Sequence, residues 1–407
     1  MPRARCLLLA AVTAVVVVST SSTSDARSTS DVRSTSVGVS TISTSNDDRG
    51  PAAVHLEGRG YGHGRGMSQW GAQGAASEHG RTYRQILRFY YPGLDLGRVR
   101  GTIRVLITGD TSDDVVVRDH RRLVLRAVAS GRTWALDRDG ASRWRLTAAN
   151  GGADTRLSVF TNRWRAVRTV AGQAELTARG PIGLVTPAGV TRYQGALRSA
   201  VASGGRDTVN VVRLEDYLRG VVPREVPALW HRQAVRAQSV AARTYAAYHR
   251  AHPRATYYDL CDTTSCQVYG GFSDHHPASD AAIRATAGEV LKSGRAPAFT
   301  EFSASNGGWT VASSVPYQVA KQDRWDPWSR NPYRHWDDVR IRATTIENAY
   351  PAIGDFQRLR VLRRDGHGAW NGRVLRIRAI GSRGSVTRTG DEFRITFGLR
   401  STWFRVR

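Results

Sequence analysis

The chain has 407 residues, enough for one large or two ordinary domains with an ample core. Its 41% hydrophobic residues and 11 tryptophans indicate a folded protein rather than a disordered one. Lys and Arg outnumber Asp and Glu by 59 to 34, and the formal charge of +25 favours a polyanionic partner: nucleic acid, anionic lipid or an acidic wall polymer. Because zinc-finger spacing and RNA-binding aromatic signatures are both missing, we do not expect nucleic acid to be that partner.

The amino-terminal segment predicts export. Arg3 and Arg5 precede an apolar run, residues 7–18, that is too short to span a bilayer and is typical of a secretory signal peptide. We expect the signal peptide to cover residues 1–26; an uncleaved anchor is the alternative. With no transmembrane segment predicted beyond it, the mature protein is expected to be secreted and to act at the cell wall, outside the cytoplasm.

Residues 27–50 are Ser/Thr-rich and short of large apolar side chains, which predicts a disordered tether. Glycines then alternate with other residues from Gly58 to Gly66. We interpret this run as an extended segment with one bare side, which another backbone or a ligand can approach closely. His63, Ser68 and Gln69 would lie beside it. A purely structural glycine turn is the alternative.

The flanking regions predict scaffold. Thr82 and Gln85 form a capping-box pattern that predicts the start of a short helix. Residues 93–207 hold short apolar runs between Gly, Asp and Asn clusters, which predicts an antiparallel β-rich scaffold. Residues 321–407 are predicted to be a β-rich closing segment, in which residues 393–397 follow a turn at Gly390.

The region 208–320 holds the core motifs. Pro223 and Pro227 are expected to stop regular structure and to hold Glu225 on a constrained turn. A long helix follows over Trp230–Arg250, where alanines and tyrosines recur at a spacing of three to four, and it ends before His252-Pro253. The apolar neighbours of Glu225 favour its protonated form, as a general acid requires. A solvated turn residue is the alternative.

Cys261 and Cys266 close a small loop, and in an exported protein a disulfide is the first expectation. No cofactor is expected if the two cysteines form this disulfide. Zinc is the alternative, and it would need two further ligands. The histidines near the pair in sequence are His249, His252, His275 and His276.

Residues 298–310 predict a strand that runs into a turn rich in Ser, Asn and Gly. Ser303 and Ser305 lie in this turn and are candidates to bond sugar hydroxyls. The alternative is that they only stabilise the turn. The aromatic segment 325–336 has the composition of a sugar-binding surface or of loop packing.

Several of these stretches resemble signatures of the stage II sporulation protein D / LytB family of cell-wall enzymes. They are LEDYLRGVVPREVPALW, AVRAQSVAARTYA, CDTTSCQVYGG, FSASNGGWT, GYGHGRGMSQWGAQG, ILRFYYPG and FGLRSTWF. The resemblance covers most of residues 55–407, and we assign 51–407 to one family-like catalytic region. The expected fold is α+β, an antiparallel β-rich body with the long helix packed on it. Two features depart from the family: the glycine-rich motif lies at residues 62–72, ahead of the catalytic motif, and EVP replaces EMP.

The resemblance implies a peptidoglycan lytic transglycosylase that cleaves the β-1,4 bond between MurNAc and GlcNAc and leaves a 1,6-anhydroMurNAc end. The family's catalytic glutamate falls on Glu225. Hydrolases usually need a second carboxylate, whereas a lytic transglycosylase can use one. Glu215, Asp216, Asp259 and Asp262 stay open as second acids. The motif members expected to line the glycan cleft are His63, Ser68, Gln69, Tyr217, Gln267, Ser303 and Ser305.

Two other functions compete with the enzyme. The family also suggests a non-catalytic amidase enhancer, a glycan-binding module that activates another wall hydrolase; the presence of Glu225 favours the enzyme. The third is a structural protein held by its charge to anionic wall polymers, whose binding high salt would abolish. The expected partners are therefore peptidoglycan glycan strands, with anionic wall polymers or a wall amidase as further candidates.

Overall fold

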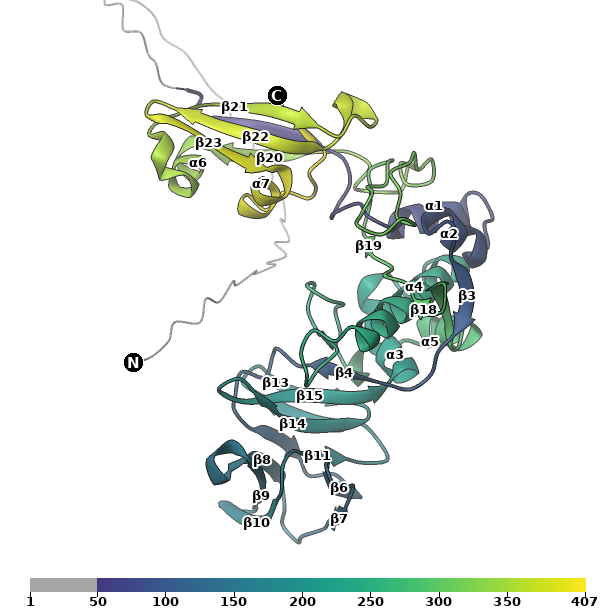
Figure 1. The fold of residues 1–407 in the computed structure, drawn as a ribbon, viewed down its shortest axis with the longest axis vertical. Helices are drawn as coiled ribbons and strands as arrows, with labels where there is room; N and C mark the ends of the chain where they lie inside the picture. Colours follow the sequence, from purple (N-terminus) through teal and green to yellow (C-terminus); the bar gives the residue numbers. More distant parts are fainter. Residues whose placement is uncertain (1–49) are drawn as a thin grey trace, which may run out of the picture. The chain divides into compact units, whose positions relative to one another are not determined.

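The structure is a computed structural model that describes residues 50–407 (Figure 1). The predicted signal peptide (1–26) and the tether (27–50, Gly50 apart) lie outside the described residues. The described part is α+β, as predicted, and nearly all of its strand pairs are antiparallel. Within it, no helix is both long and apolar enough to cross a membrane.

Two sheets form the β-rich body, and alternating Val, Leu and Ile from both build one core. The larger sheet has the order β16 (Leu260–Cys261), β4 (Thr102–Leu106), β15 (Gly205–Arg213), β14 (Ala196–Ala202), β11 (Ala174–Thr177), β6 (Leu123–Ala127), β7 (Thr133–Leu136). The other has the order β10 (Trp164–Val170), β9 (Asp154–Phe160), β8 (Arg143–Ala149), β5 (Val115–Arg118), β12 (Ile182–Thr186), β13 (Gly189–Tyr193). The predicted scaffold at 93–207 is largely this body.

The helix α3 (Leu214–Glu225) leaves β15 directly, and its buried Leu218, Val221 and Val222 join the same core. We predicted that Pro223 would end regular structure before Glu225; this was wrong, since Pro223 lies inside the helix. Proline removes one hydrogen bond to the preceding turn. In the last turn that loss is small beside the apolar burial of the residues just before it, so α3 continues to Glu225.

The long helix α4 spans Arg232–Ala251, close to the predicted Trp230–Arg250, and is capped at His252 before the proline. Its small residues, among them Ala234, Ala237 and Ala241, pack in a second core with α1 (Gln69–Ser77) and α2 (Tyr83–Tyr90). The predicted capping box of α2 is present. Helix α5 (Pro277–Ala285) packs on α3 and α4.

Two small sheets of short strands accompany these helices. A three-stranded sheet has the order β18 (Ala296–Pro297), β17 (Glu289–Ser293), β3 (Asp95–Arg98), and β19 (Phe302–Ser303) pairs in parallel with β2 (Met67–Ser68). The β19–β2 pair brings the glycine-rich motif beside the Ser/Asn turn.

The glycine run is not an extended segment with a bare side, as we had predicted. The φ angles of four glycines in this run are positive, between 63° and 99°: Gly60, Gly62, Gly64 and Gly66. The chain therefore does not adopt an extended conformation there. The predicted close approach of backbone is present, because a Cβ on Gly66 would lie 1.9 Å from the carbonyl oxygen of Glu301.

The carboxyl-terminal part holds a third core. β1 (Ala53–Gly58) lies between β20 (Trp336–Arg342) and β24 (Phe404–Val406), and a meander follows the order β21 (Phe356–Arg364), β22 (Val374–Gly381), β23 (Gly384–Thr389). Helix α6 spans Ala343–Ala349. The strand-like interpretation of residues 393–397 was wrong: Gly390–Thr396 is helix α7, because Thr389 and Glu392 make a capping box that we had overlooked.

Candidate active site

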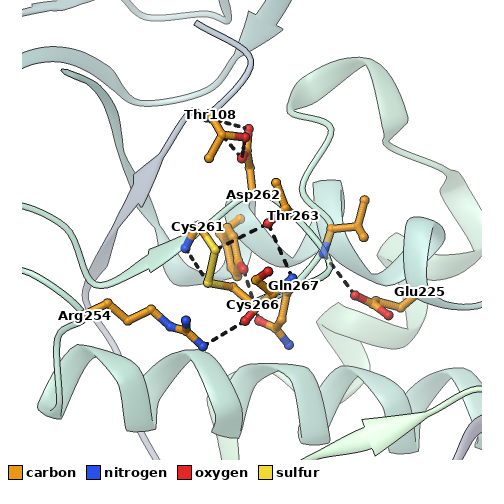
Figure 2. The surroundings of a disulfide bond; sticks show 11 residues. Thr108, Glu225, Arg254, Cys261, Asp262, Thr263, Cys266 and Gln267 are labelled. Atoms are coloured by element: carbon orange, nitrogen blue, oxygen red, sulfur yellow. Dashed lines mark hydrogen bonds between the residues drawn. A yellow bond between two sulfur atoms is a disulfide. The ribbon is translucent and has the colours of Figure 1, made fainter. Parts of the chain in front are cut away.

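Glu225 is the last residue of α3, and two segments far apart in the sequence hold its carboxylate. Oε1 accepts a hydrogen bond from the backbone N–H of Val268 at 3.1 Å, and Oε2 accepts one from Nε2 of Gln69 at 3.4 Å. Figure 2 shows Glu225 beside the loop that the disulfide closes. The carboxylate is thus fixed by neutral donors from the glycine-rich motif and from the disulfide loop.

Burial raises the pKa of Glu225 from its ordinary value of 4.5 to about 7, although the hydrogen bonds from Val268 and Gln69 act in the opposite direction. Among the described residues no basic side chain forms an ion pair with this carboxylate, so nothing cationic offsets the cost of its charge. A carboxyl group with this pKa is partly protonated at neutral pH. It can therefore give a proton and afterwards take one.

The carboxylate faces a cavity of about 380 Å³. The glycine-rich loop, the disulfide loop, the segment that runs into β19, and residues of and just after α3 and α4 build it. The lining residues are His63, Arg65, Glu225, Tyr245, Arg254, Thr264, Ser265, Cys266, Val268, Phe299, Glu301 and Phe302. Aromatic rings beside charged groups suit a ligand that has both apolar faces and hydroxyl or carboxylate groups.

A second carboxylate lines the same cavity. Glu301 pairs with Arg65, with 2.8 Å between Arg65 Nη2 and Glu301 Oε1, and Arg65 Nε donates to the same oxygen at 2.9 Å. The guanidinium thus neutralises Glu301, in contrast to Glu225. The cavity holds two acids in two electrostatic environments: Glu225 is buried without an ion pair, and Glu301 is paired with an arginine.

His63 lies in the cavity as a neutral imidazole. Its Nδ1 accepts a hydrogen bond from the backbone N–H of Arg65 at 3.0 Å, which leaves Nε2 to carry the proton. Burial, with a smaller contribution from nearby arginines, lowers the pKa of His63 to about 3. His63 is therefore a hydrogen-bond donor at neutral pH and does not exchange protons there.

The disulfide loop forms one wall of the cavity. Cys261 and Cys266 are joined by a disulfide with a Cα–Cα distance of 5.5 Å, and Thr264 and Ser265 line the cavity beside it. Arg254 donates from Nη2 to the carbonyl oxygen of Ser265 at 2.8 Å (Figure 2). The covalent closure and this bond fix the segment that presents the Val268 N–H to Glu225.

The structure brings two of the other predicted site residues to Glu225 or its cavity: Gln69, which bonds the carboxylate, and His63. The glycine-rich motif therefore reaches the segment that holds Glu225 despite its early place in the chain. The remaining five residues are buried and do not line the cavity. They are Ser68, Tyr217, Gln267, Ser303 and Ser305.

These five side chains have partners inside the protein. Ser68 caps α1, and both it and Ser305 donate to the buried Asp326. Tyr217 donates to Gln267 at 3.0 Å, and Ser303 accepts from the N–H of Gly64 at 3.2 Å. In this structure they organise the motifs behind the cavity.

None of the four open second acids lines the cavity. Three of them pair with arginines: Glu215 with Arg243, Asp216 with Arg213, and Asp259 with Arg104. Asp262 accepts from Thr108. The acid that does line the cavity, Glu301, was missed in the sequence, as were Arg65 and Arg254. Arg65 stands inside the glycine run and Glu301 directly before FSASN, so their places in two family-like motifs were the available signal.

The aromatic segment 325–336 packs inside the protein. Trp325 stacks near Phe89, with ring centroids 4.3 Å apart, and Nε1 of Trp328 donates to the carbonyl oxygen of Trp70 at 3.2 Å. Trp336 is buried as well. Of the two interpretations of this segment, loop packing describes these three side chains.

Glu225 is a buried carboxyl group whose pKa lies near neutral pH, and it lines a cavity that also contains polar side chains. It is therefore a candidate site for acid–base chemistry. Residues 202–292, from the end of β14 to β17, match the family model described as stage II sporulation protein. The matched region contains Glu225 and the disulfide loop.

Two relatives match shorter stretches. The chain is 43% identical over 116 residues to a Bacillus subtilis (strain 168) protein named amidase enhancer, which covers 27% of this chain and 16% of that protein. It is 34% identical over 129 residues to an uncharacterized protein of Brachyspira hyodysenteriae, covering 31% of this chain and 35% of that protein. The matches thus span about a sixth and about a third of these relatives.

Proposed function

We propose that this protein is a peptidoglycan lytic transglycosylase that acts outside the cytoplasm, with Glu225 as its single acid and base. The family match and the relative named amidase enhancer support a cell-wall-related role. The observation that carries the catalytic step is the environment of Glu225: burial raises its pKa to about 7, and its hydrogen-bond donors are neutral.

In the proposed reaction, protonated Glu225 gives its proton to the oxygen of the glycosidic bond between MurNAc C1 and GlcNAc. The C1–O bond breaks and positive charge develops at C1. The Glu225 carboxylate then takes the proton of the MurNAc C6 hydroxyl, whose oxygen bonds to C1 and closes the 1,6-anhydro ring. The glutamate ends protonated, as it began, and water is not consumed.

The cavity supplies what the two steps need. The pKa of about 7 makes both protonation states of Glu225 accessible near neutral pH. The Glu301 carboxylate, paired with Arg65, lines the same cavity. Neutral His63 lines the cavity, hydrogen-bonded to the backbone of Arg65 and Phe302. Hydrolysis with Glu301 as the base is the enzymatic alternative, and the Arg65 pair disfavours it because two guanidinium nitrogens already hold one Glu301 carboxylate oxygen.

The second candidate is a non-catalytic amidase enhancer, favoured by the name of the Bacillus relative. It would use the same cavity to bind glycan and would present a wall amidase to its substrate. It gives no reason for a carboxyl group whose charge is disfavoured by burial, so the transglycosylase is the better account of Glu225.

The deciding experiment is mass spectrometry of soluble products from purified glycan strands, both stripped and peptide-bearing, with the wild type and Glu225→Gln. The proposal expects fragments with anhydroMurNAc ends from the wild type and none from the variant. Reducing-end products would indicate a hydrolase. Unchanged strands, with binding intact in both proteins, would favour the enhancer.

A further inference from the structure

Strands β21, β22 and β23 form the carboxyl-terminal meander (Figure 1). Its outer face carries five arginines. Its inner face, with Leu359, Val361, Ile377 and Ala379, packs on the third core. Since side chains alternate between faces along a strand, the residues between these point outward. The outward arginines are Arg358, Arg360, Arg376 and Arg378, together with Arg363, which the bulge in β21 places opposite Arg376.

The strand register places these like charges directly opposite one another. Arg360 pairs with Arg378 across β21 and β22, and Arg363 pairs with Arg376 where β21 bulges. Like charges in opposed cross-strand positions destabilise a sheet. Two successive cross-strand pairs therefore destabilise this sheet. Local choices that oppose the stability of the fold are typical of functional surfaces.

The described residues supply no carboxylate to offset that cost. None of the ion pairs among residues 50–407 involves the five arginines, and the β23 residues beside β22 on this face are Ser385, Thr387 and Thr389. The one contact of the five guanidinium groups is from Arg378 Nε to Oγ1 of Thr387, at 3.2 Å. Four of the five side chains are exposed, and Arg378 is half-buried.

We infer that this arginine face binds a flexible polyol-phosphate polymer, an interaction separate from the glycan cavity. The guanidinium fork matches a phosphate in bidentate geometry. Arginines two residues apart along a strand lie about 7 Å apart, so two adjacent strands give a double row that fits a chain of repeated phosphates better than one small anion. The face bears Arg, Ser, Thr, Ile and Leu but no aromatic ring, so it lacks the stacking platform on which single-stranded nucleic acid depends.

The test compares binding of poly(glycerol phosphate) to residues 27–407 and to the double variant Arg360→Gln/Arg378→Gln, over a range of salt concentrations. The matched control, Arg163→Gln/Arg165→Gln, removes the same charge from exposed positions at the β9–β10 hairpin. We expect the meander variant to lose about tenfold or more in affinity and to show a shallower salt dependence. The control should bind nearly as the wild type does, and the Tm of the meander variant should equal or exceed that of the wild type, because an opposed like-charge pair has been removed.

Equal losses in both variants would overturn the inference, since binding would then follow net charge. A meander variant that binds weakly and also has a lower Tm would overturn it as well, because the arginines would then serve the fold. Tighter binding of duplex DNA or of anionic lipid vesicles than of poly(glycerol phosphate) would assign the face to another partner. Product analysis on glycan strands is independent of this result, so this inference and the proposed catalytic function can fail separately.

Discussion

Nε2 of Gln69 donates a hydrogen bond to Oε2 of Glu225 across 156 residues of sequence. The bond joins the first residue of α1 to the last residue of α3. It shows how a glycine-rich motif that precedes the catalytic motif by a whole β-rich body still reaches the carboxylate. The geometry of Glu225 therefore depends on contacts that no local stretch of sequence contains.

This contact predicts a shift in the pH dependence of activity. The Gln69 amide favours the charged form of Glu225, so Gln69→Ala should raise the pKa of Glu225. The alkaline limb of the pH–rate profile should then move to higher pH by less than about one pH unit. Gln73→Ala, on the same helix but hydrogen-bonded to His231, is the control and should leave the profile unchanged. An acid shift in the Gln69 variant would contradict the assigned direction of the bond.

Glu225→Gln should abolish activity and yet stabilise the fold at alkaline pH. The folded protein retains the Glu225 proton up to about pH 7, whereas the unfolded chain loses it near 4.5. Burying this carboxylate thus costs nothing below the unfolded value, and the penalty grows as the pH rises towards the folded value, to at most about 3 kcal/mol. Denaturant unfolding of both proteins at about pH 4 and about pH 8 measures this. The free energy of unfolding of the variant should exceed that of the wild type only at the higher pH. If the variant differs from the wild type equally at both pH values, Glu225 is not held neutral by burial.

Glu301→Gln separates one-carboxylate from two-carboxylate chemistry. If Glu301 is only a fixed anion paired with Arg65, its loss should lower kcat far less than loss of the acid, for which general acid–base catalysis predicts about 100-fold or more. Arg65→Gln serves as the companion variant, since it frees Glu301 without removing it. Comparable losses in Glu301→Gln and Glu225→Gln would favour the hydrolase.

The disulfide should matter more for activity than for folding. The loop between Cys261 and Cys266 is short, so chain entropy gives the bond only about 2 kcal/mol. The same loop presents three lining residues, Thr264, Ser265 and Cys266, to the cavity and directly precedes the segment whose Val268 N–H bonds Glu225. Cys261→Ser/Cys266→Ser should therefore remain folded, by circular dichroism, while its turnover falls at least about tenfold. Full activity in the folded variant would contradict this role for the loop.

The sequence predicted the fold class, the long helix and the helix α2 because periodicity and capping are local signals. It misplaced the end of α3 because a single proline in a last turn is outweighed by tertiary burial of Leu218, Val221 and Val222, which no local pattern reveals. The missed helix α7 had a local signal, Thr389 and Glu392, which the strand-like residues around it obscured.

For the candidate site, the motif resemblance proposed Glu225, Gln69 and His63, which the structure brings together. It could not distinguish motif members that line the cavity from those that hold the motifs together, since Ser68 and Ser305 differ from lining residues only in the buried Asp326 that they share. Glu301 and Arg65 were missed for a related reason. Their pairing spans 236 residues, so the charge environment that sets Glu301 apart from Glu225 exists only in the folded chain.

The most direct test of the central claim is to run the glycan reaction in water labelled with heavy oxygen and to weigh the new ends by mass spectrometry. The account predicts ends one water lighter than a reducing sugar and free of label, formed by the wild type and not by Glu225→Gln, because the C6 oxygen of MurNAc closes on C1. New reducing ends that carry the label would show that water attacks C1 and would contradict a single-carboxylate transglycosylase.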